Sequence, residues 1–117
     1  MSDCLFCKIA AGEIPVEKIY EDDTVVAFPD INPVAPVHVL IIPKRHYTTT
    51  LVMSEEAPEL FGCIMKASSE VARIKGIAES GFRLIINTNR DAGQEIFHVH
   101  MHLMGGERIG RLRAKLF

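Results

Sequence analysis

Apolar residues gather in runs whose length and composition predict β-strands along much of the chain. Two short strands are expected at residues 18–22 and 24–28, joined by an acidic turn. The run at 37–42 is rich in β-branched residues and lies between prolines, as a buried strand would. Residues 82–87 form another run, and 97–104 alternate between polar and apolar positions before a pair of glycines. We therefore predict a sheet whose strands come from both halves of the chain.

Between the runs at 37–42 and 82–87 the apolar spacing changes to that of a helix. Ser54 is expected to cap a long helix, Pro58 to lie in its first turn, and Gly76 to end it. A shorter helix is expected from Leu5 to Ala11, ended by Gly12. Strands before and after one long helix predict an α+β fold with a mostly antiparallel sheet.

The length, charge and cysteine content of the chain exclude several classes of protein. The chain has 117 residues, of which 48% are hydrophobic, so we expect one domain with its own core over residues 1–117. Lys and Arg number 13 against 15 Asp and Glu, which gives a net charge of -2 and no basic footprint for nucleic acid. No apolar stretch is long enough to span a membrane, and the N-terminus lacks the pattern of a secretory signal. Three cysteines, an odd number, favour reduced thiols in the cytoplasm.

Three of the five histidines stand at alternate positions, His98, His100 and His102. In a regular strand they would share a face, with neighbours ~6.6 Å apart and the outer pair ~13 Å apart. Because zinc–nitrogen bonds are ~2 Å long, the three rings could not all bind one metal. A solvent-exposed strand face would explain the spacing but not the choice of histidine. We expect a division of labour, in which a neutral imidazole is a nucleophile and a neighbour donates a hydrogen bond or proton.

A polar loop leads into the histidine strand. It holds Asn87, Gly93, Gln94 and Glu95. A glycine there lets backbone N–H groups approach an anion closely, which suits phosphate. Taken alone, Asn87 and Gly93 would indicate only a turn. Their place beside the histidines favours a phosphate site.

The segment 98–104, in which each histidine precedes an apolar residue, resembles the signature of the histidine triad family. The likeness covers nearly the whole chain and includes segments 28–33, 36–44 and 87–94. Within the family the chain looks like the nucleoside phosphoramidase branch. The resemblance implies the family's fold, a mostly antiparallel five-stranded sheet with one long helix and a short N-terminal helix. It also implies a homodimer.

By this resemblance His100 is the nucleophile, which attacks the α-phosphorus of a purine nucleoside phosphoramidate or aminoacyl-adenylate. A nucleotidyl-histidine intermediate would then be hydrolysed to release AMP or GMP. His102 would hold a phosphate oxygen and assist the leaving group, and His38 would support the histidine cluster as a further catalytic residue. Asp30 would accept hydrogen bonds from the ribose, with Ile31 against the base. The remaining nucleotide-binding positions that the resemblance implies are Asn87, Gly93, Gln94 and Glu95. This route requires no metal.

Two departures from the family pattern bear on substrate preference. Glu95 stands where some members have a serine near the leaving group, and its charge could alter the choice of leaving group. The sequence also ends with a short tail at Leu116 and Phe117, and in this family the tail helps to shape the partner subunit's site.

Cys4 and Cys7 form a Cys-x-x-Cys pair near the N-terminus. They could simply be small buried residues, as we expect for Cys63 on the long helix. A zinc site would need two more ligands, for which His46 and His98 are candidates. A Cys₂His₂ set would be closed and structural. Some histidine triad proteins resemble this arrangement, so we expect structural zinc at these four residues.

Two other functions compete with phosphoramidate hydrolysis. One is hydrolysis of dinucleoside polyphosphates, which occurs elsewhere in the superfamily. The other is a non-catalytic protein that binds nucleotide or zinc and uses the scaffold for interaction, against which the intact His100 argues.

Overall fold

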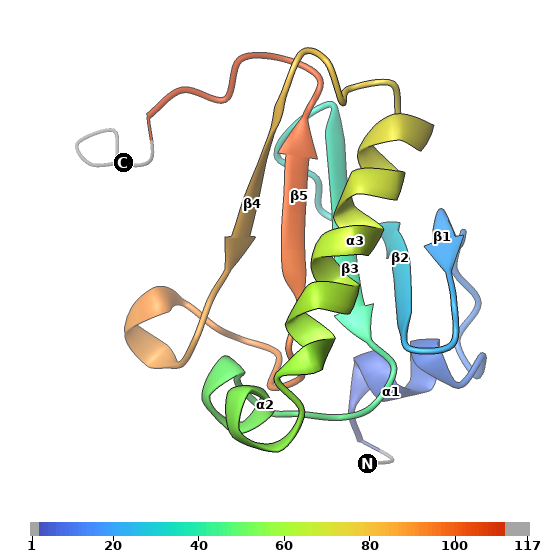
Figure 1. The fold of residues 1–117 in the computed structure, drawn as a ribbon, viewed down its shortest axis with the longest axis vertical. Coiled ribbons are helices and arrows are strands. Elements are labelled where there is room, and N and C mark those ends of the chain that lie inside the picture. Colours follow the sequence, from blue (N-terminus) through green and yellow to red (C-terminus); the bar gives the residue numbers. More distant parts are fainter. Residues whose placement is uncertain (1–2, 112–117) are drawn as a thin grey trace.

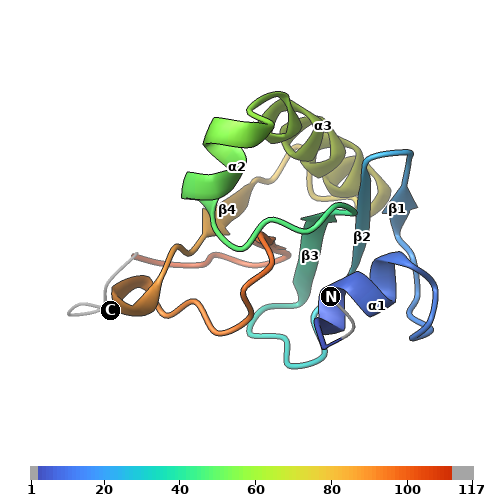
Figure 2. The same ribbon diagram turned by 90° about the horizontal axis from the view of Figure 1, so that it is seen from below.

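The computed structural model describes residues 3–111 and shows five antiparallel strands with helices on both faces of the sheet (Figures 1 and 2). The strands lie in the order β1-β2-β3-β5-β4. Their bounds are β1 Tyr20–Glu21, β2 Val25–Pro29, β3 Val37–Pro43, β4 Phe82–Ile86 and β5 Met101–Gly105. The predicted α+β class and the mostly antiparallel five-stranded sheet are confirmed. The tail residues Leu116 and Phe117 lie outside the described part of the chain.

The two faces of the sheet follow directly from the alternation of side chains along each strand. One face packs on the long helix α3, Glu59–Ile74, and the other on the short helix α1, Leu5–Ala10 (Figure 2). The sheet residues on the α3 side include Val25, Ala27, Val39, Ile41, Met101 and Leu103. Those on the α1 side include Val26, Phe28, Leu40 and Ile42, which pack with Phe6 and Ile9. Because the apolar runs are buried on both faces, the core has two layers.

The register of the central strands decides which histidines share the α1 face. In the pair of β3 and β5, Leu40 lies opposite His102 and His38 opposite Met104. Directly opposed residues point to the same side of a sheet. His38 and His102 therefore both project to the α1 side, and a polar site is built into that layer.

The helical segment before α3 differs from the prediction. Ser54 does not cap a long helix but lies inside a separate helix α2, Thr50–Glu56, whose cap is Thr49. The Thr49 hydroxyl accepts a hydrogen bond from the Val52 N–H at 3.3 Å. Pro58 is the N-cap residue of α3 rather than a member of its first turn. A proline has no N–H and its ring clashes with the carbonyl four residues earlier, so α2 ends before it and a new helix begins.

The histidine strand is also shorter than predicted, because β5 begins only at Met101 and residues 97–100 are irregular. Ile41 and Met101 form the last pair of the ladder with β3, which ends at Pro43. The carbonyl of Pro43 is instead contacted by the His98 ring, with 2.7 Å between His98 Nε2 and the oxygen. His98 and His100 therefore do not hold regular strand positions. No helix among residues 3–111 is long and apolar enough to cross a membrane.

Candidate active site and metal-binding cluster

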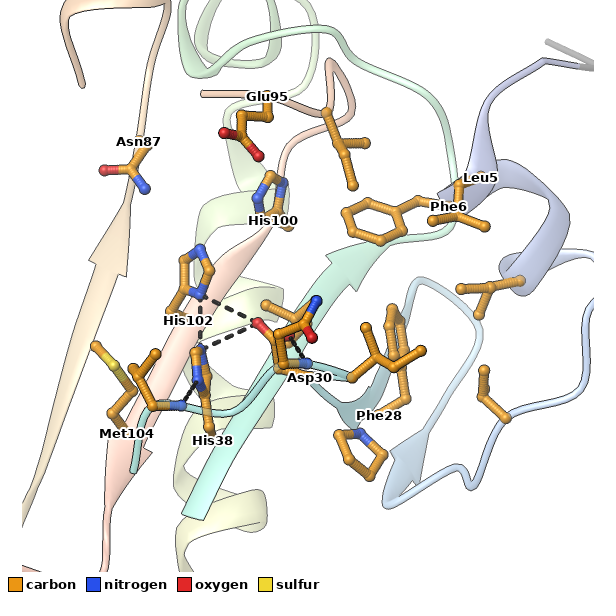
Figure 3. A pocket seen from close by; sticks show the side chains of 18 of the residues that line it. Leu5, Phe6, Phe28, Asp30, His38, Asn87, Glu95, His100, His102 and Met104 are labelled. Carbon is orange, nitrogen blue, oxygen red and sulfur yellow. Dashed lines mark hydrogen bonds and ion pairs between the residues drawn. The ribbon is translucent and has the colours of Figure 1, made fainter. Parts of the chain in front are cut away.

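A cavity of about 780 Å³ opens on the α1 face of the sheet, beside the ends of β3, β4 and β5 (Figure 3). One part of it is apolar and is lined by Leu5, Phe6, Ile9, Ile14, Val16, Phe28 and Ile31. The other part is polar and is lined by Asp30, His38, Asn87, Gly93, Glu95, His100 and His102. No lysine or arginine is among the described lining residues. The cavity can thus hold a flat apolar group next to polar atoms, with acidic side chains but no permanent cation.

His100 lies between the two parts of the cavity and is only 9% exposed. Its Nδ1 is 2.8 Å from the backbone carbonyl oxygen of His98. A carbonyl can only accept, so Nδ1 carries the proton and donates it to this hydrogen bond. In the neutral ring the other nitrogen, Nε2, then has a free lone pair. The geometry makes His100 a competent nucleophile.

A chain of hydrogen bonds sets the proton positions on His38 and His102. The N–H of Val34 donates to His38 Nδ1 at 3.1 Å, so the proton of the neutral His38 ring is on Nε2. His38 Nε2 lies 2.9 Å from His102 Nδ1 and donates to it. His102 therefore carries its own proton on Nε2 (Figure 3). Because the hydrogen bond from His38 uses only Nδ1, the Nε2–H of His102 remains free to donate to a ligand.

Burial keeps both of these rings neutral near neutral pH. It lowers the pKa of His38, against the opposing effect of the Asp30 carboxylate. Burial also lowers the pKa of His102 to about 4, with further lowering from the charges that His100 and His38 would carry. Asp30 Oδ2 lies 3.3 Å from His38 Nε2, while its Oδ1 accepts from the Asn32 N–H at 2.8 Å. Asp30 is thus held in place at the edge of the cavity.

The loop before β5 brings Asn87, Gly93 and Glu95 to the cavity but turns the side chain of Gln94 inward. Gln94 Oε1 accepts from the Asn89 N–H at 2.8 Å. Its Nε2 donates to the carbonyl oxygens of Thr48 at 2.8 Å and Ile96 at 3.1 Å. The Gln94 N–H also donates, to the Asn89 carbonyl at 3.1 Å, so Gln94 offers no free donor to a phosphate. Its side chain is a brace for the loop, a role that no local sequence pattern indicates.

The four predicted metal ligands come together at the N-terminal end of α1. One ligand atom each from Cys4, Cys7, His46 and His98 lies within 4.8 Å of all the others. His98 Nδ1 is 3.3 Å from Cys4 Sγ and 3.5 Å from Cys7 Sγ, and His46 Nδ1 is 3.2 Å from Cys7 Sγ. Since His98 Nε2 donates to Pro43, its Nδ1 carries a lone pair that faces the thiols. Two sulfurs and two imidazole nitrogens form a donor set that fits a tetrahedral metal ion such as zinc.

Phe6 lies between Cys4 and Cys7 in the sequence. In the structure its ring contacts both histidines edge-on, at centroid distances of 5.9 Å to His98 and 5.1 Å to His100. It is 2% exposed and also packs on Phe28 at 5.7 Å. Phe6 therefore joins the cluster of Cys4, Cys7, His46 and His98 to His100. Its position between two cysteines spaced for one helical turn was the available signal.

Known proteins resemble this chain over most of its length. The chain matches the family model of the HIT domain over residues 11–109. It is 46% identical over 112 residues to the purine nucleoside phosphoramidase of Escherichia coli K12, covering 96% of this chain and 94% of that protein. Protein HitA of Neisseria gonorrhoeae is 47% identical over 105 residues, covering 90% of this chain and 97% of that protein.

Solved structures show the same fold. A HIT family hydrolase from Clostridium thermocellum superposes with a TM-score of 0.91 at 48% identity, over 95% of this chain and 96% of that chain. A histidine triad protein from Clostridium difficile gives a TM-score of 0.93 at 42% identity, over 97% of this chain and 98% of that chain. The fold and site thus define a hydrolase with a histidine cluster in a cavity of about 780 Å³. More particularly, the chain belongs to the histidine triad family.

Proposed function

We propose that the protein hydrolyses purine nucleoside phosphoramidates and aminoacyl-adenylates through a nucleotidyl-His100 intermediate, and releases AMP or GMP. The observation that carries the proposal is the hydrogen bond from His100 Nδ1 to the His98 carbonyl, which leaves Nε2 free to attack phosphorus. The name of the Escherichia coli relative, purine nucleoside phosphoramidase, supports the substrate class.

The cavity offers each part of such a substrate a suitable surface. The purine would lie in the apolar part, with the 89% exposed Ile31 against it. The ribose hydroxyls would donate to Asp30. The phosphate would lie between His100 and His102, whose ring centroids are 5.3 Å apart. The Asn87 side chain and the Glu95 N–H would contact the phosphate oxygens, because amides donate to anions without requiring a charge. The N–H groups of Gly93 and Gln94 already donate to the carbonyls of Arg90 and Asn89.

The reaction proceeds in two displacements. In the first, a bond forms between His100 Nε2 and phosphorus while the bond from phosphorus to the amine nitrogen breaks. The departing nitrogen accepts a hydrogen bond from His102 Nε2 and takes its proton from a water molecule, so the ring stays neutral. In the second, the hydroxide formed from that water attacks phosphorus, and the bond to His100 breaks. The protein contributes mainly position and charge stabilisation.

The charges in the cavity favour this reaction over hydrolysis of dinucleoside polyphosphates. Asp30 and Glu95 line the described cavity, and no lysine or arginine accompanies them. A chain of several phosphates would bring additional negative charge toward these carboxylates with no cation to compensate. The two activities can be compared directly with an adenosine phosphoramidate and a diadenosine polyphosphate. Turnover of the dinucleotide alone would refute the substrate class proposed here.

The His100→Ala variant tests the nucleophile. We expect it to lose turnover by a factor of at least ~10³ while it still folds and binds AMP. In the wild type, acid quenching during turnover with a radiolabelled adenylate should trap label on the protein, and the variant should trap none. The control is Cys63→Ala, which changes a partly buried side chain of α3 that packs in the α3-side core. Equal turnover by His100→Ala and wild type would contradict the mechanism.

We also propose that Cys4, Cys7, His46 and His98 bind zinc as a structural ion. All four ligands are provided by protein, so the ion would hold segments together and would not activate water. Metal analysis should find one zinc per chain in the wild type and far less in Cys7→Ser. Wild-type protein that takes up no zinc would refute this part of the proposal.

Three further features belong to the same proposal. A homodimer is supported by β4, an edge strand with five partly buried residues and, among residues 3–111, no strand on its outer side. On α3, Met65 is 51% exposed and would suit such an interface, whereas Ile64 is 1% exposed and belongs to the core. A cytoplasmic location is supported by the three free cysteines. A single domain over 1–117 is supported by the one sheet, whose strands span residues 20–105.

A further inference from the structure

His98 connects the metal-ligand cluster to the nucleophile. We propose that an ion bound by Cys4, Cys7, His46 and His98 keeps His100 in the tautomer and orientation that attack phosphorus, so that occupancy of the cluster controls the rate of the bond-forming step. This inference rests on the function proposed above. It gives the cluster a role beyond holding the fold together, and it makes His98 and Phe6 positioning residues for the reaction.

The first link runs through the two ends of the His98 residue. Its ring faces the thiols of Cys4 and Cys7 with Nδ1, while Nε2 donates to Pro43 at 2.7 Å. Its backbone carbonyl accepts from His100 Nδ1 at 2.8 Å. The ring is fully buried, so it cannot turn without moving its neighbours. Any displacement of the ring toward or away from the thiols therefore moves the carbonyl that orients His100.

The second observation is that the segment around His98 and His100 has no regular secondary structure to hold it. Residues 97–100 lie in no strand, and the ladder with β3 begins only at Met101. Apart from its side chains, the segment is tied to the rest of the protein by a bond from the Val99 N–H to the Tyr47 carbonyl at 2.8 Å. The His98 ring is consequently a main anchor of its own backbone. A metal–nitrogen bond to that ring would be far stiffer than the 3.3 Å and 3.5 Å contacts to sulfur.

The third link is α1, which supplies two ligands and a packing contact at once. Cys4 caps this helix by accepting from the Cys7 N–H at 3.3 Å, and Phe6 lies between them against the rings of both His98 and His100. A helix of six residues is too short to be stable by itself. An ion shared with His46 and His98 would fasten α1 to two distant segments. Phe6 would then be pressed edge-on against the nucleophile.

Loss of the hydrogen bond to His98 would impair the attack on phosphorus. If the His98 carbonyl moves away, His100 can carry its proton on Nε2, and Nε2 then has no lone pair with which to attack. The loss would fall on the step that forms the bond, since a misplacement of ~1 Å can cost ~10²-fold in rate. The affinity for AMP should fall much less than the rate, because Asp30 and His38 hold their places through contacts outside the cluster.

The test follows the proton on His100 directly. In protein with ¹⁵N-labelled histidine, two-bond nitrogen–proton correlation distinguishes the two ring tautomers, and the His100→Ala variant assigns the signal. Spectra, kcat and the AMP dissociation constant are measured for zinc-loaded, chelator-treated and reloaded wild type. The main variant is His46→Ala, because His46 is exposed and its removal costs little packing. Cys7→Ala is the second variant, and its thiol control is Cys63→Ala.

We expect the loaded wild type to show His100 with its proton on Nδ1, and the stripped protein and both ligand variants to show a mixture. The kcat should fall at least ~10-fold on stripping, more than the affinity for AMP, and recover on reloading. Val71→Ala, a buried change on α3 in the α3-side core that does not line the cavity, controls for lost stability and should retain the tautomer.

An unchanged His100 signal in folded, stripped protein would overturn the inference, and so would an equal loss of kcat in Val71→Ala. Failure to bind titrated zinc would overturn it as well. These outcomes are distinct from failure of the proposed function. If wild type hydrolyses no phosphoramidate in any metal state, the function is wrong, whereas the tautomer signal still reports whether the cluster orients His100.

Discussion

Acidification should destabilise the protein through His102. Burial is the main cause that lowers the pKa of this ring from 6.5 to about 4. In the unfolded chain the ring is exposed and titrates near ~6.5. Between these two pH values the unfolded state binds a proton that the folded state does not bind. The free energy of unfolding is therefore highest above the unfolded pKa and decreases as the pH falls toward the folded one.

The size of this effect can be worked out from the structure. At ~1.4 kcal/mol per pH unit, the interval from 6.5 to about 4 corresponds to ~3 kcal/mol. The His102 side chain is 20% exposed, and solvent screening reduces the contribution, so we expect about 2 kcal/mol. His102→Asn removes the titrating ring, while the amide oxygen can still accept from His38 Nε2. The variant should therefore lose about 2 kcal/mol less stability than the wild type on acidification.

Urea denaturation at about pH 7 and about pH 4.5 measures the difference for each protein. Groups that do not contact His102 contribute equally in both proteins, so their pH effects cancel when the two differences are subtracted. Equal pH dependence in wild type and His102→Asn, within ~0.5 kcal/mol, would refute the assignment of a strongly lowered pKa to His102.

Three further predictions concern the loop and its surroundings. Gln94→Ala removes three hydrogen bonds and should cost ~2 to 3 kcal/mol, measured by urea denaturation; a cost below ~0.5 kcal/mol would show that the brace is unimportant. Gly106→Ala should cost ~1 to 3 kcal/mol in the same assay, because φ is +92° and a Cβ would lie 2.9 Å from Pro36 Cβ, whereas Ser80→Ala should be nearly neutral. Glu95→Gln should raise the kcat/KM for a diadenosine polyphosphate relative to an adenosine phosphoramidate by about threefold, with Asp91→Asn as the control outside the cavity; an unchanged ratio would contradict the charge argument.

The arrangement of the elements could be predicted well because it follows from local patterns. The run at 37–42 is bounded by prolines and became the central strand β3, and the spacing from Leu60 to Ile74 became α3. The prediction failed where a local signal had two interpretations. Ser54 suits an N-cap, but Thr49 lies ahead of an earlier helical turn, and Pro58 separates two helices rather than joining them.

The sequence by itself identified the candidate chemical groups, which are the alternating histidines, the Cys-x-x-Cys pair and the polar loop. It also indicated a division of labour among the histidines, because one metal could not reach three rings on a regular strand. Only the tertiary structure decided how that division is made. The protons on His38, His100 and His102 are placed by Val34, His98 and His38, through contacts that span up to 64 positions in the chain. Such contacts depend on the register of β3 with β5 and on where that ladder stops, and local periodicity does not encode either one.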